Sequence, residues 1–558
     1  MPEKAFSVCI KDSVFIDPAA GSGNFLTETY LSLRRLENET LKRLLDGQPL
    51  LDNTDPIKVS ISQFYGIEIN DFAVTVAKTA LWIAESQMMK ETESIVRMDM
   101  DFLPLKTNAN VVEGNALRID WNEVVPKSEL TYIMGNPPFV GYAFRSQEQK
   151  KDIALVCQGA GKNMDYVAGW YWKASELMQG STIRAALVST NSITQGEQVA
   201  SIWKLLYDKF GIHIDFAHRT FRWDSEANLK AHVHCVIVGF STALNNQERK
   251  LYENGRCQIV KQINPYLVDA ETVFIEGREK PICNVPIMRR GSQPTDDGNL
   301  IMSLEEYEQY SKEEPQGTKF LRPYMMGKDF IDRKPRYCFW LVGANPTELR
   351  KCPQIMARVE KVREFRLASK KEATKKKAET PTLFDEIKAC DTSYVAIPKV
   401  SSEKRLYVPM EYLDPSIIAG DKLFMVPDAD LYTFGVLTSN IHMAWMRSVC
   451  GRLEMRYSYS NTIVYNNFPW PDPTDEQKVE IEKTAQKILD ARAKYSDSSL
   501  ADLYDPDVMP PELRSAHQHN DKAVMAAYGL KKNAPEFSSE SACVAFLMKL
   551  YQQITASK

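Results

Sequence analysis

The chain has 558 residues, a length that accommodates two or three domains of ordinary size. Its 44% hydrophobic and 25% charged residues are the proportions of an ordinary soluble protein. The formal net charge of −4 argues against binding a polyanion through the field of the whole molecule, so such binding requires a local basic patch.

Targeting and metal-binding segments are not indicated by the sequence. No apolar stretch approaches the length of a membrane span, and residues 1–13 lack the apolar core of a signal peptide. The ten cysteines form no Cys-x-x-Cys pair, which argues against a zinc ribbon or a disulfide scaffold and favours reduced thiols in the cytoplasm. His232-Val233-His234-Cys235 alternates polar and apolar residues, which indicates a strand and not a metal site.

The first predicted element is a strand, a glycine turn and a helix over residues 14–26. Gly21 and Gly23 permit a tight turn and let a ligand approach the backbone at the N-terminus of the helix. A Gly-x-Gly pair alone is a weak signal, because the third glycine of the dinucleotide-binding motif is missing. The longer string Asp-Pro-x-x-Gly-Ser-Gly-Asn-Phe, from Asp17 to Phe25, is more specific.

Two further predicted strands also end in polar side chains. Residues 61–69 end with Glu68, whose carboxylate is suited to accept hydrogen bonds from ribose hydroxyls. Residues 110–117 include Asn115, whose amide is suited to read the edge of an adenine. Because the carboxyl ends of parallel strands share one edge of a sheet, we expect these side chains to face a common ligand there.

A fourth hydrophobic run, residues 131–135, leads into the tetrapeptide Asn136-Pro137-Pro138-Phe139. The exocyclic amine of a base is a poor nucleophile because its lone pair is delocalised into the ring. The Asn136 side-chain oxygen and a neighbouring backbone carbonyl would accept its two hydrogens and localise that lone pair. The prolines stiffen the backbone, and Phe139 offers a stacking face for a base taken out of a duplex. An Asn-Pro-Pro string is also compatible with a plain turn.

Taken together, these motifs resemble the amino-methyltransferases of DNA that use S-adenosylmethionine, and their order matches the adenine-specific group. The match extends to the MmeI-like, type IIL restriction-modification proteins and their YeeA-type relatives. Four further strings carry this resemblance, over residues 165–172, 189–198, 216–223 and 466–471. The similarity runs from about Val14 to the C-terminus.

The resemblance implies a catalytic site at the fourth strand end, where Asn136, Pro137, Pro138 and Phe139 would hold and stack the target adenine. The S-adenosylmethionine-binding residues would be Asp17, Pro18, Ala19, Gly21, Gly23, Asn24, Phe25, Glu68, Ile69, Asn115 and Ala116. Phe25 is also compatible with core packing, and Asn115 stands where the wider family more often has aspartate. No metal is needed, because the sulfonium methyl group is already an activated electrophile.

The implied fold is α/β and has three parts. Residues 1–243 would form a Rossmann-like class I methyltransferase domain, with a mainly parallel sheet and an antiparallel last hairpin. That hairpin is predicted because residues 212–220 and 233–240 are joined too briefly for a helical crossover. Residues 244–472 would form an α+β target-recognition domain, and residues 473–558 a small helical cap. Its helices are predicted over residues 476–495, 513–528 and 539–551.

Double-stranded DNA is the implied partner, and two groups of residues are candidates for reading it. Phe221 and Trp223 occupy positions where related enzymes pack around the extruded base, although aromatics at a strand end are also common in cores. Arg452, Glu454 and Arg456 suit major-groove readout, in which arginine pairs with guanine and glutamate accepts from cytosine. Surface ion pairing explains the same three residues.

Residues 358–377 form the strongest basic segment, with nine basic and three acidic side chains. Val359, Val362 and Phe365 would anchor a helix that carries, on a shared face, Arg363, Arg366 and Lys370. Lys370 and Lys371 are candidates for phosphate contacts. A solvated charged helix explains the same pattern.

Alternative functions also fit some of these motifs. Cytosine N4-methyltransferases use an X-Pro-Pro-aromatic motif, and a catalytically idle DNA-recognition subunit would keep the same domains. Protein glutamine methyltransferases use Asn-Pro-Pro-Tyr but need no large recognition region. The sequence does not distinguish restriction, phage defence and solitary modification.

Sixteen residues precede Asp17, whereas relatives carry a further cofactor motif, a helical segment and often a nuclease before this point. We therefore expect a cofactor pocket open on one side and no DNA cleavage by this chain alone. The nuclease or helical part would be absent or separately encoded, and a version extended at the N-terminus would bind S-adenosylmethionine more tightly.

Overall fold

The computed structural model describes residues 10–45, 56–97, 109–224, 232–243, 248–530 and 533–556. The chain forms two compact units, Met1–Phe274 and Ile275–Lys558. The predicted boundary at residues 243 and 244 adjoins residues 244–247, which lie outside the described ranges, and the three-part division stays a prediction. Within the described residues, none of the helices combines the length and the apolar character needed to cross a membrane.

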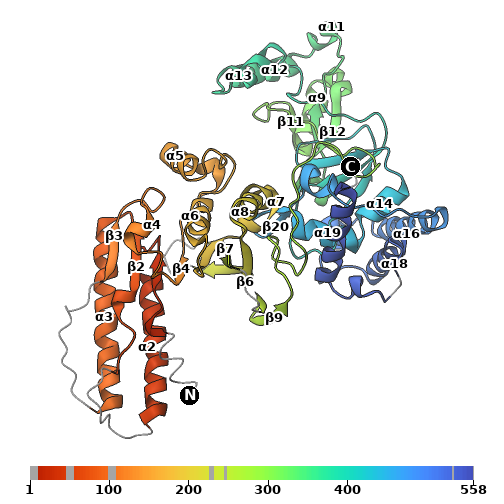
Figure 1. The fold of residues 1–558 in the computed structure, drawn as a ribbon. Coiled ribbons are helices and arrows are strands. Elements are labelled where there is room, and N and C mark those ends of the chain that lie inside the picture. Colours follow the sequence, from red (N-terminus) through yellow and green to blue (C-terminus); the bar gives the residue numbers. More distant parts are fainter. Residues whose placement is uncertain are drawn as a thin grey trace. The chain divides into compact units, whose positions relative to one another are not determined.

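A nine-stranded sheet organises the first unit (Figure 1). Its strands follow one another in the order β3 (Asn110–Glu113), β2 (Phe64–Glu68), β1 (Phe15–Asp17), β4 (Tyr132–Gly135), β5 (Arg184–Thr190), β7 (His232–Ser241), β6 (His213–Asp224), β8 (Arg249–Glu253) and β9 (Arg256–Val260). The first five run parallel, and β7 is antiparallel to both β5 and β6. The predicted mainly parallel sheet with an antiparallel last hairpin is therefore confirmed.

Helices connect the parallel strands, as crossovers in such a sheet require. They are α2 (Asn24–Leu45), α3 (Asp71–Val96), α4 (Trp121–Val124), α5 (Gln147–Val156), α6 (Ala168–Met178), α7 (Gly196–Val199) and α8 (Leu205–Phe210). Figure 1 shows α2 and α3 side by side, and their apolar faces pack with β1 and β2 around Phe15, Leu26, Phe64 and Leu81. This core holds the ends of β1 and β2 in a defined position.

The second unit contains three small sheets. The first consists of β10 (Arg289–Arg290), β18 (Leu423–Pro427), β14 (Tyr394–Pro398) and β16 (Glu411–Leu413). The second consists of β11 (Ile301–Met302), β13 (Arg336–Phe339), β12 (Leu321–Met325) and β17 (Ile418–Ala419). The third consists of β15 (Val400–Ser401), β20 (Arg456–Ser458) and β19 (Gly451–Leu453). A hydrophobic core joins the second sheet to α9 (Leu304–Glu313) and α12 (Pro353–Leu367). The mixed strands and helices match the predicted α+β character.

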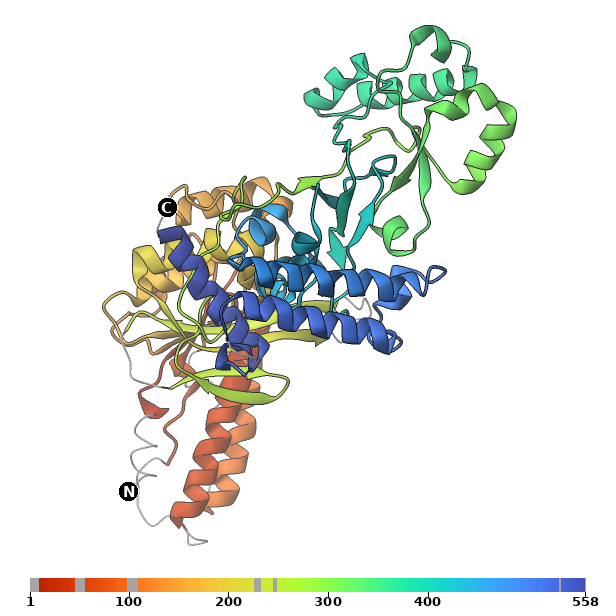
Figure 2. The same ribbon diagram turned by 90° about the vertical axis from the view of Figure 1, so that its right-hand side faces the viewer.

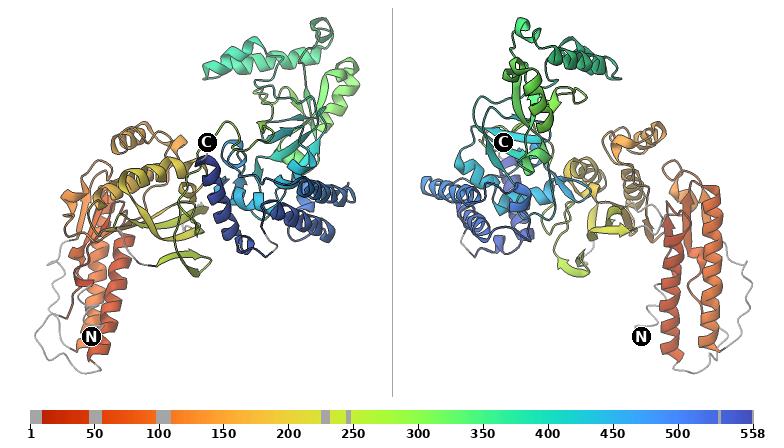
Figure 3. Two further views of the ribbon diagram at one scale, coloured as in Figure 1. Left: turned by 45° about the vertical axis from the view of Figure 1, so that its right-hand side comes forward. Right: turned by 180° about the vertical axis from the view of Figure 1, so that it is seen from behind.

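The remaining helices of this unit are α10 (Gly327–Ile331), α11 (Pro346–Leu349), α13 (Glu372–Lys376), α14 (Leu431–Leu437), α15 (Asn440–Val449), α16 (Asp475–Ala493), α17 (Leu500–Leu503), α18 (Pro511–Ala527) and α19 (Glu540–Ala556). Helices α16 and α18 pack against each other, as Figure 2 shows in blue. The predicted C-terminal helical segment is confirmed. Both views of Figure 3 place α12, in teal, at an edge of the second unit away from α16 and α18.

Candidate active site

Asp17 is the last residue of β1, and its side chain is fully buried. Its Oδ1 accepts a hydrogen bond from the Ala19 N–H at 2.9 Å, whereas none of the described donors reaches Oδ2. Burial, and to a lesser degree the Glu68 carboxylate, raises the pKa of Asp17 to about 7, against the lowering effect of the Ala19 hydrogen bond. A buried carboxylate oxygen without a donor is costly, and it fits a ligand that supplies a hydrogen bond or a positive charge.

Gly135, the last residue of β4, leaves the space that the Asp17 side chain occupies. A Cβ atom at position 135 would lie 2.5 Å from Asp17 Oδ1, closer than real Cβ atoms approach a neighbour. In the sequence, Gly135 stands out only as the end of a hydrophobic run. Its position directly before Asn136 was the feature of the sequence that could have indicated its role.

Glu68 ties the turn between β1 and α2 to the end of β2. The Gly21 N–H donates to Glu68 Oε2 at 2.9 Å, and the Asn70 N–H donates to Oε1 at 3.0 Å. Gly21 and Gly23 have φ values of +53° and +81°, a left-handed conformation that favours glycine. The carboxylate oxygens keep further lone pairs, so Glu68 supports the glycine turn and still has acceptor capacity for a ligand.

The other predicted cofactor residues differ in exposure. Ile69 is 68% exposed, and Phe72 in the first turn of α3 is 74% exposed. Such exposed apolar side chains beside a polar strand end offer a contact face to a planar ring. Phe72 was not predicted as a site residue, although an aromatic residue four positions after Glu68 could have indicated it. Asn24 is exposed and Phe25 is half-buried.

Two tryptophans hold the backbone of the predicted cofactor residues. Trp170 on α6 donates its Nε1–H to the Pro18 carbonyl at 2.9 Å. Trp121 on α4 donates to the carbonyl of the buried Ala116 at 2.8 Å. Both indoles therefore hold main-chain geometry, and each uses one of the two lone pairs of its carbonyl oxygen.

Asn136 follows β4 directly, and its Oδ1 is buried without any donor among the described residues. Pro137 is buried, Pro138 is exposed and Phe139 is half-buried. A buried amide oxygen without a partner costs free energy unless a ligand supplies the donor. This oxygen therefore fits an incoming N–H group, as the sequence interpretation requires.

The loop after Asn136 is held by Asp165 and Tyr166. The Tyr166 N–H donates to the Val140 carbonyl at 2.9 Å, and the Tyr142 N–H donates to Asp165 Oδ1 at 2.9 Å. Ser192 donates its hydroxyl to Asp165 Oδ2 at 2.7 Å. The string 165–172, which the sequence showed only as a family feature, thus has a structural role in fixing the loop after Asn136.

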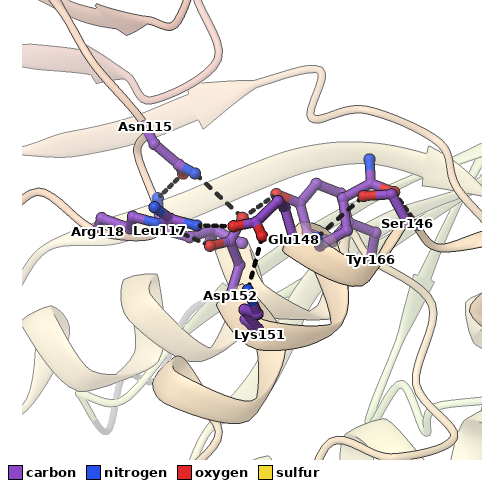
Figure 4. Close-up of polar contacts among 9 residues, drawn as sticks. Asn115, Leu117, Arg118, Ser146, Glu148, Lys151, Asp152 and Tyr166 are labelled. Atoms are coloured by element: carbon purple, nitrogen blue, oxygen red, sulfur yellow. Dashed lines mark hydrogen bonds and ion pairs between the residues drawn. The ribbon is translucent and has the colours of Figure 1, made fainter.

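Asn115 does not present a free amide to a ligand. Its Oδ1 accepts from the Leu117 N–H at 2.9 Å, and its Nδ2 donates to Asp152 Oδ2 on α5 at 3.1 Å (Figure 4). One amide hydrogen and one oxygen lone pair remain. Asp152 lies 37 residues away in sequence, and no motif pointed to it.

Phe221 and Trp223 lie within β6, which continues past the predicted end at residue 220 to Asp224. A bulge separates His218 from Phe221 in the pairing with β7. The two rings lie 6.1 Å apart, and Trp223 is 38% exposed. Bulges re-aim side chains near functional sites, and Trp223 remains accessible to a base.

In the second unit, Arg452, Glu454 and Arg456 lie on the β19–β20 hairpin. The half-buried Arg452 donates from its two terminal nitrogens to the Met455 and Arg447 carbonyls, each at 3.2 Å, while its buried Nε–H reaches none of the described acceptors. Exposed Arg456 and Glu454 form an ion pair at 2.9 Å. The hairpin tip is therefore the accessible part of this group.

The predicted shared face of Arg363, Arg366 and Lys370 is wrong. Arg366 is fully buried and donates five hydrogen bonds to the backbone carbonyls of Pro294, Thr295, Lys377, Thr380 and Leu383. Helix α12 ends at Leu367, so Lys370 lies beyond it.

Phe365, predicted as an anchor of α12, is 39% exposed, and Ile355 packs into the core beside Val359 and Val362 instead. Lys370 and Lys371 are exposed. These two lysines therefore remain candidates for phosphate contacts.

A cavity of about 510 Å³ lies elsewhere in the first unit. Its lining includes Phe15, Tyr132 and Arg184, the first residues of β1, β4 and β5, and none of the predicted site residues. The polar side chains at the opposite, carboxyl ends of β1, β2 and β4 make that edge the candidate active site.

A mainly parallel sheet with a glycine turn after β1 and an Asn-Pro-Pro-Phe loop after β4 places the first unit in the class of Rossmann-like proteins. Comparisons with known families identify three consecutive segments: the MmeI DNA-methyltransferase domain over residues 4–253, the MmeI target recognition domain over 269–472 and the MmeI C-terminal domain over 473–557. The chain belongs to the MmeI family, which confirms the resemblance found from sequence.

Individual relatives agree with this assignment. DNA methyltransferase A of Bacillus subtilis is 38% identical over 547 residues, which are 97% of this chain. This chain spans 61% of the length of that relative. A solved structure of the type IIL restriction-modification enzyme MmeI in complex with DNA is 43% identical, with a TM-score of 0.91 over 100% of this chain and 75% of that one. A putative type II restriction enzyme and methyltransferase of Methanocaldococcus jannaschii is 27% identical over 29% of this chain and 14% of its own length.

Proposed function

We propose that this chain transfers a methyl group from S-adenosylmethionine to N6 of an adenine in a specific sequence of double-stranded DNA. The observation that carries the proposal is the buried Asn136 Oδ1, which none of the described donors reaches, at the carboxyl edge of the sheet. Such an acceptor fits an exocyclic amine. The MmeI-family membership supports a role in restriction-modification or phage defence in the cytoplasm.

The residues at the ends of β1 and β2 fit the proposed cofactor. Asp17 offers Oδ2 to a positively charged amino group, and the left-handed Gly21 and Gly23 let a ligand approach the backbone. Glu68 keeps acceptor capacity for ribose hydroxyls. When bound, S-adenosylmethionine supplies an electrophilic methyl group on its sulfonium.

The chain's own contribution to catalysis would be positioning. Asn136 Oδ1 and the Pro137 carbonyl would accept the two hydrogens of the adenine amine, and Phe139 would stack on the extruded ring. The loop geometry is set in advance by Asp165 and Tyr166, so little ordering is left for the moment of reaction. No strong base is required, because methyl transfer leaves the amine positively charged, and this protonated product is acidic enough to lose its proton to solvent.

We assign methyl transfer to residues 1–243, target recognition to 244–472 and a helical support to 473–558. Exposed Lys370 and Lys371 would contact phosphates, and the Glu454–Arg456 hairpin tip would face base edges. Phe221 and Trp223 would contact the extruded base.

The decisive experiment is transfer of a labelled methyl group to DNA followed by analysis of the modified nucleosides. We expect label in N6-methyladenine. Label in N4-methylcytosine would overturn the adenine assignment, and an unlabelled product from a chain that binds DNA would favour an idle recognition subunit. Sequencing of the modified DNA would then give the recognised site.

Cofactor affinity should depend on pH through Asp17. The ionised carboxylate attracts the cofactor's amino group, and the pKa of Asp17 is raised to about 7. The cofactor should therefore bind tightly above this pH and more weakly below it. Between pH 7.5 and 6.0 we expect the Kd for S-adenosylmethionine to rise about eightfold, following the ionised fraction. Calorimetry at both pH values measures it. In Asp17→Asn, binding should be weaker and independent of pH, and an unchanged dependence would assign the titration to another group.

DNA affinity should depend on the exposed lysines after α12. Replacing Lys370 and Lys371 by alanine should weaken binding to all sequences and reduce the slope of log K against log salt by about 2, the value for two lost phosphate contacts. The matched control replaces Lys483 and Lys487, exposed on α16, and changes the net charge equally. If both double variants keep the parental slope, Lys370 and Lys371 are only solvated.

A further inference from the structure

Asp152 is a buried acid on the otherwise largely exposed helix α5, and its carboxylate accepts three hydrogen bonds (Figure 4). Oδ2 accepts from Asn115 Nδ2 at 3.1 Å and from the Tyr166 hydroxyl at 2.9 Å. Oδ1 accepts from Arg118 Nε at 2.7 Å. A carboxylate is the side chain that accepts all three without offering a competing donor.

The partners of Asn115 determine which way its amide is turned. Its Oδ1 accepts from the Leu117 N–H, and its Nδ2 donates to Asp152. The flipped amide would set Nδ2 against an N–H and Oδ1 against a carboxylate, so one orientation satisfies both contacts. The remaining amide hydrogen and oxygen lone pair of Asn115 thereby point in fixed directions.

Tyr166 connects the same carboxylate to the Asn136 loop. Its hydroxyl donates to Asp152, and its N–H donates to the Val140 carbonyl. Its ring meets that of Trp170 edge-on at 5.3 Å, and Trp170 donates to the Pro18 carbonyl. One set of contacts therefore runs from the end of β3 to the turns that follow β1 and β4.

We propose that Asp152 is a positioning residue, which fixes the orientation of the Asn115 amide in the cofactor site and joins that site to the Asn136 loop. This inference rests on the proposed function, because it takes Asn115 to face the cofactor's adenine. The proposed role of Asp152 acts through Asn115 and Tyr166 and needs no contact of its own with the methyl donor or the target base.

Exchanging the two side chains gives a sharp test. In Asp152→Asn, an amide nitrogen must face either Arg118 Nε or Asn115 Nδ2, and the second arrangement flips Asn115 away from Leu117. In Asn115→Asp, the carboxylates at positions 115 and 152 face each other across the distance that the parent's hydrogen bond spans, and they repel each other. In the double variant, the amide at position 152 donates to the carboxylate at position 115 and keeps its oxygen toward Arg118. The Tyr166 hydroxyl can then turn and accept a hydrogen bond from the same amide.

Glu148 provides the matched control. It lies on the same helix and also contacts Arg118, at 3.2 Å, but it is exposed and does not touch Asn115. Glu148→Ala should leave cofactor binding unchanged. Tyr166→Phe removes one hydrogen bond to Asp152 but leaves its contact with Asn115, so it should affect methyl transfer more than cofactor affinity.

The measurements are calorimetry with S-adenosylmethionine, thermal unfolding and methyl transfer, all on the full chain. We expect the Kd to rise about tenfold in each single Asp152→Asn or Asn115→Asp variant. In the double variant it should fall again by about threefold but stay above the parent value, because the amide hydrogen at position 115 is lost. Rescue of affinity by the exchange is not expected if Asp152 only supports folding. Single variants that bind like Glu148→Ala, or a double variant as weak as both singles, would overturn the inference. A parent that binds the cofactor but transfers no methyl group would refute the proposed function alone.

Discussion

Replacing Asn136 by alanine is expected to slow methyl transfer about a hundredfold to a thousandfold, the range seen when one preorganised polar group is removed from an active site. Cofactor affinity should stay within about threefold of the parent, because the proposed contact is made only with the target amine. Single-turnover transfer to cognate DNA measures the first quantity, and calorimetry with S-adenosylmethionine measures the second. The buried Oδ1 of Asn136, which none of the described donors reaches, is the basis of this expectation.

Asn136→Asp is the informative companion to the alanine variant. It keeps an acceptor oxygen at nearly the same place and should retain more activity than Asn136→Ala. Equal rates for the parent and the alanine variant would remove Asn136 from the reaction. Equal losses in cofactor affinity and transfer rate would instead indicate a general distortion of the loop after β4.

Replacing Arg366 by alanine should destabilise the second unit by about 3–5 kcal/mol, because a large buried side chain and five hydrogen bonds are lost together. Its guanidinium donates five hydrogen bonds, at 2.8–3.1 Å, to backbone carbonyls of residues 294–295 and 377–383. Without it those carbonyls lose their shared donor, and a cavity opens in the core. Thermal and urea unfolding of the full chain measure the loss.

Arg363, one turn earlier on the same helix, is the matched control. It is 46% exposed and pairs with Glu360 at 3.4 Å on the surface. Arg363→Ala should change stability by less than about 0.5 kcal/mol. A similar small change in Arg366→Ala would show that its contacts to the carbonyls contribute little.

The fold of the first unit followed from short-range patterns. Hydrophobic runs that end in Asp17, Glu68 and Asn136 predicted parallel strands, and strands of this kind bring their carboxyl ends to one edge. The brief connection between β6 and β7 predicted their antiparallel pairing, which the structure contains. These features depend on residues close together in the chain, so the sequence alone was sufficient.

The roles of individual polar residues depended on partners far away in sequence. Helical spacing placed Arg366 on a face with Arg363, but periodicity does not reveal that carbonyls from residues 294–295 and 377–383 surround it. Likewise the space for Asp17 depends on Gly135 from another strand.

By itself, the sequence determined the class of fold, the family and the strand ends that carry the candidate site. It did so because motif order and hydrophobic periodicity are local properties of the chain. Only the tertiary structure decided that Asn115 is turned by Asp152, that Arg452 donates to two backbone carbonyls and that Arg366 is buried. The physical reason is that a polar side chain takes its role from the donors and acceptors that folding brings around it.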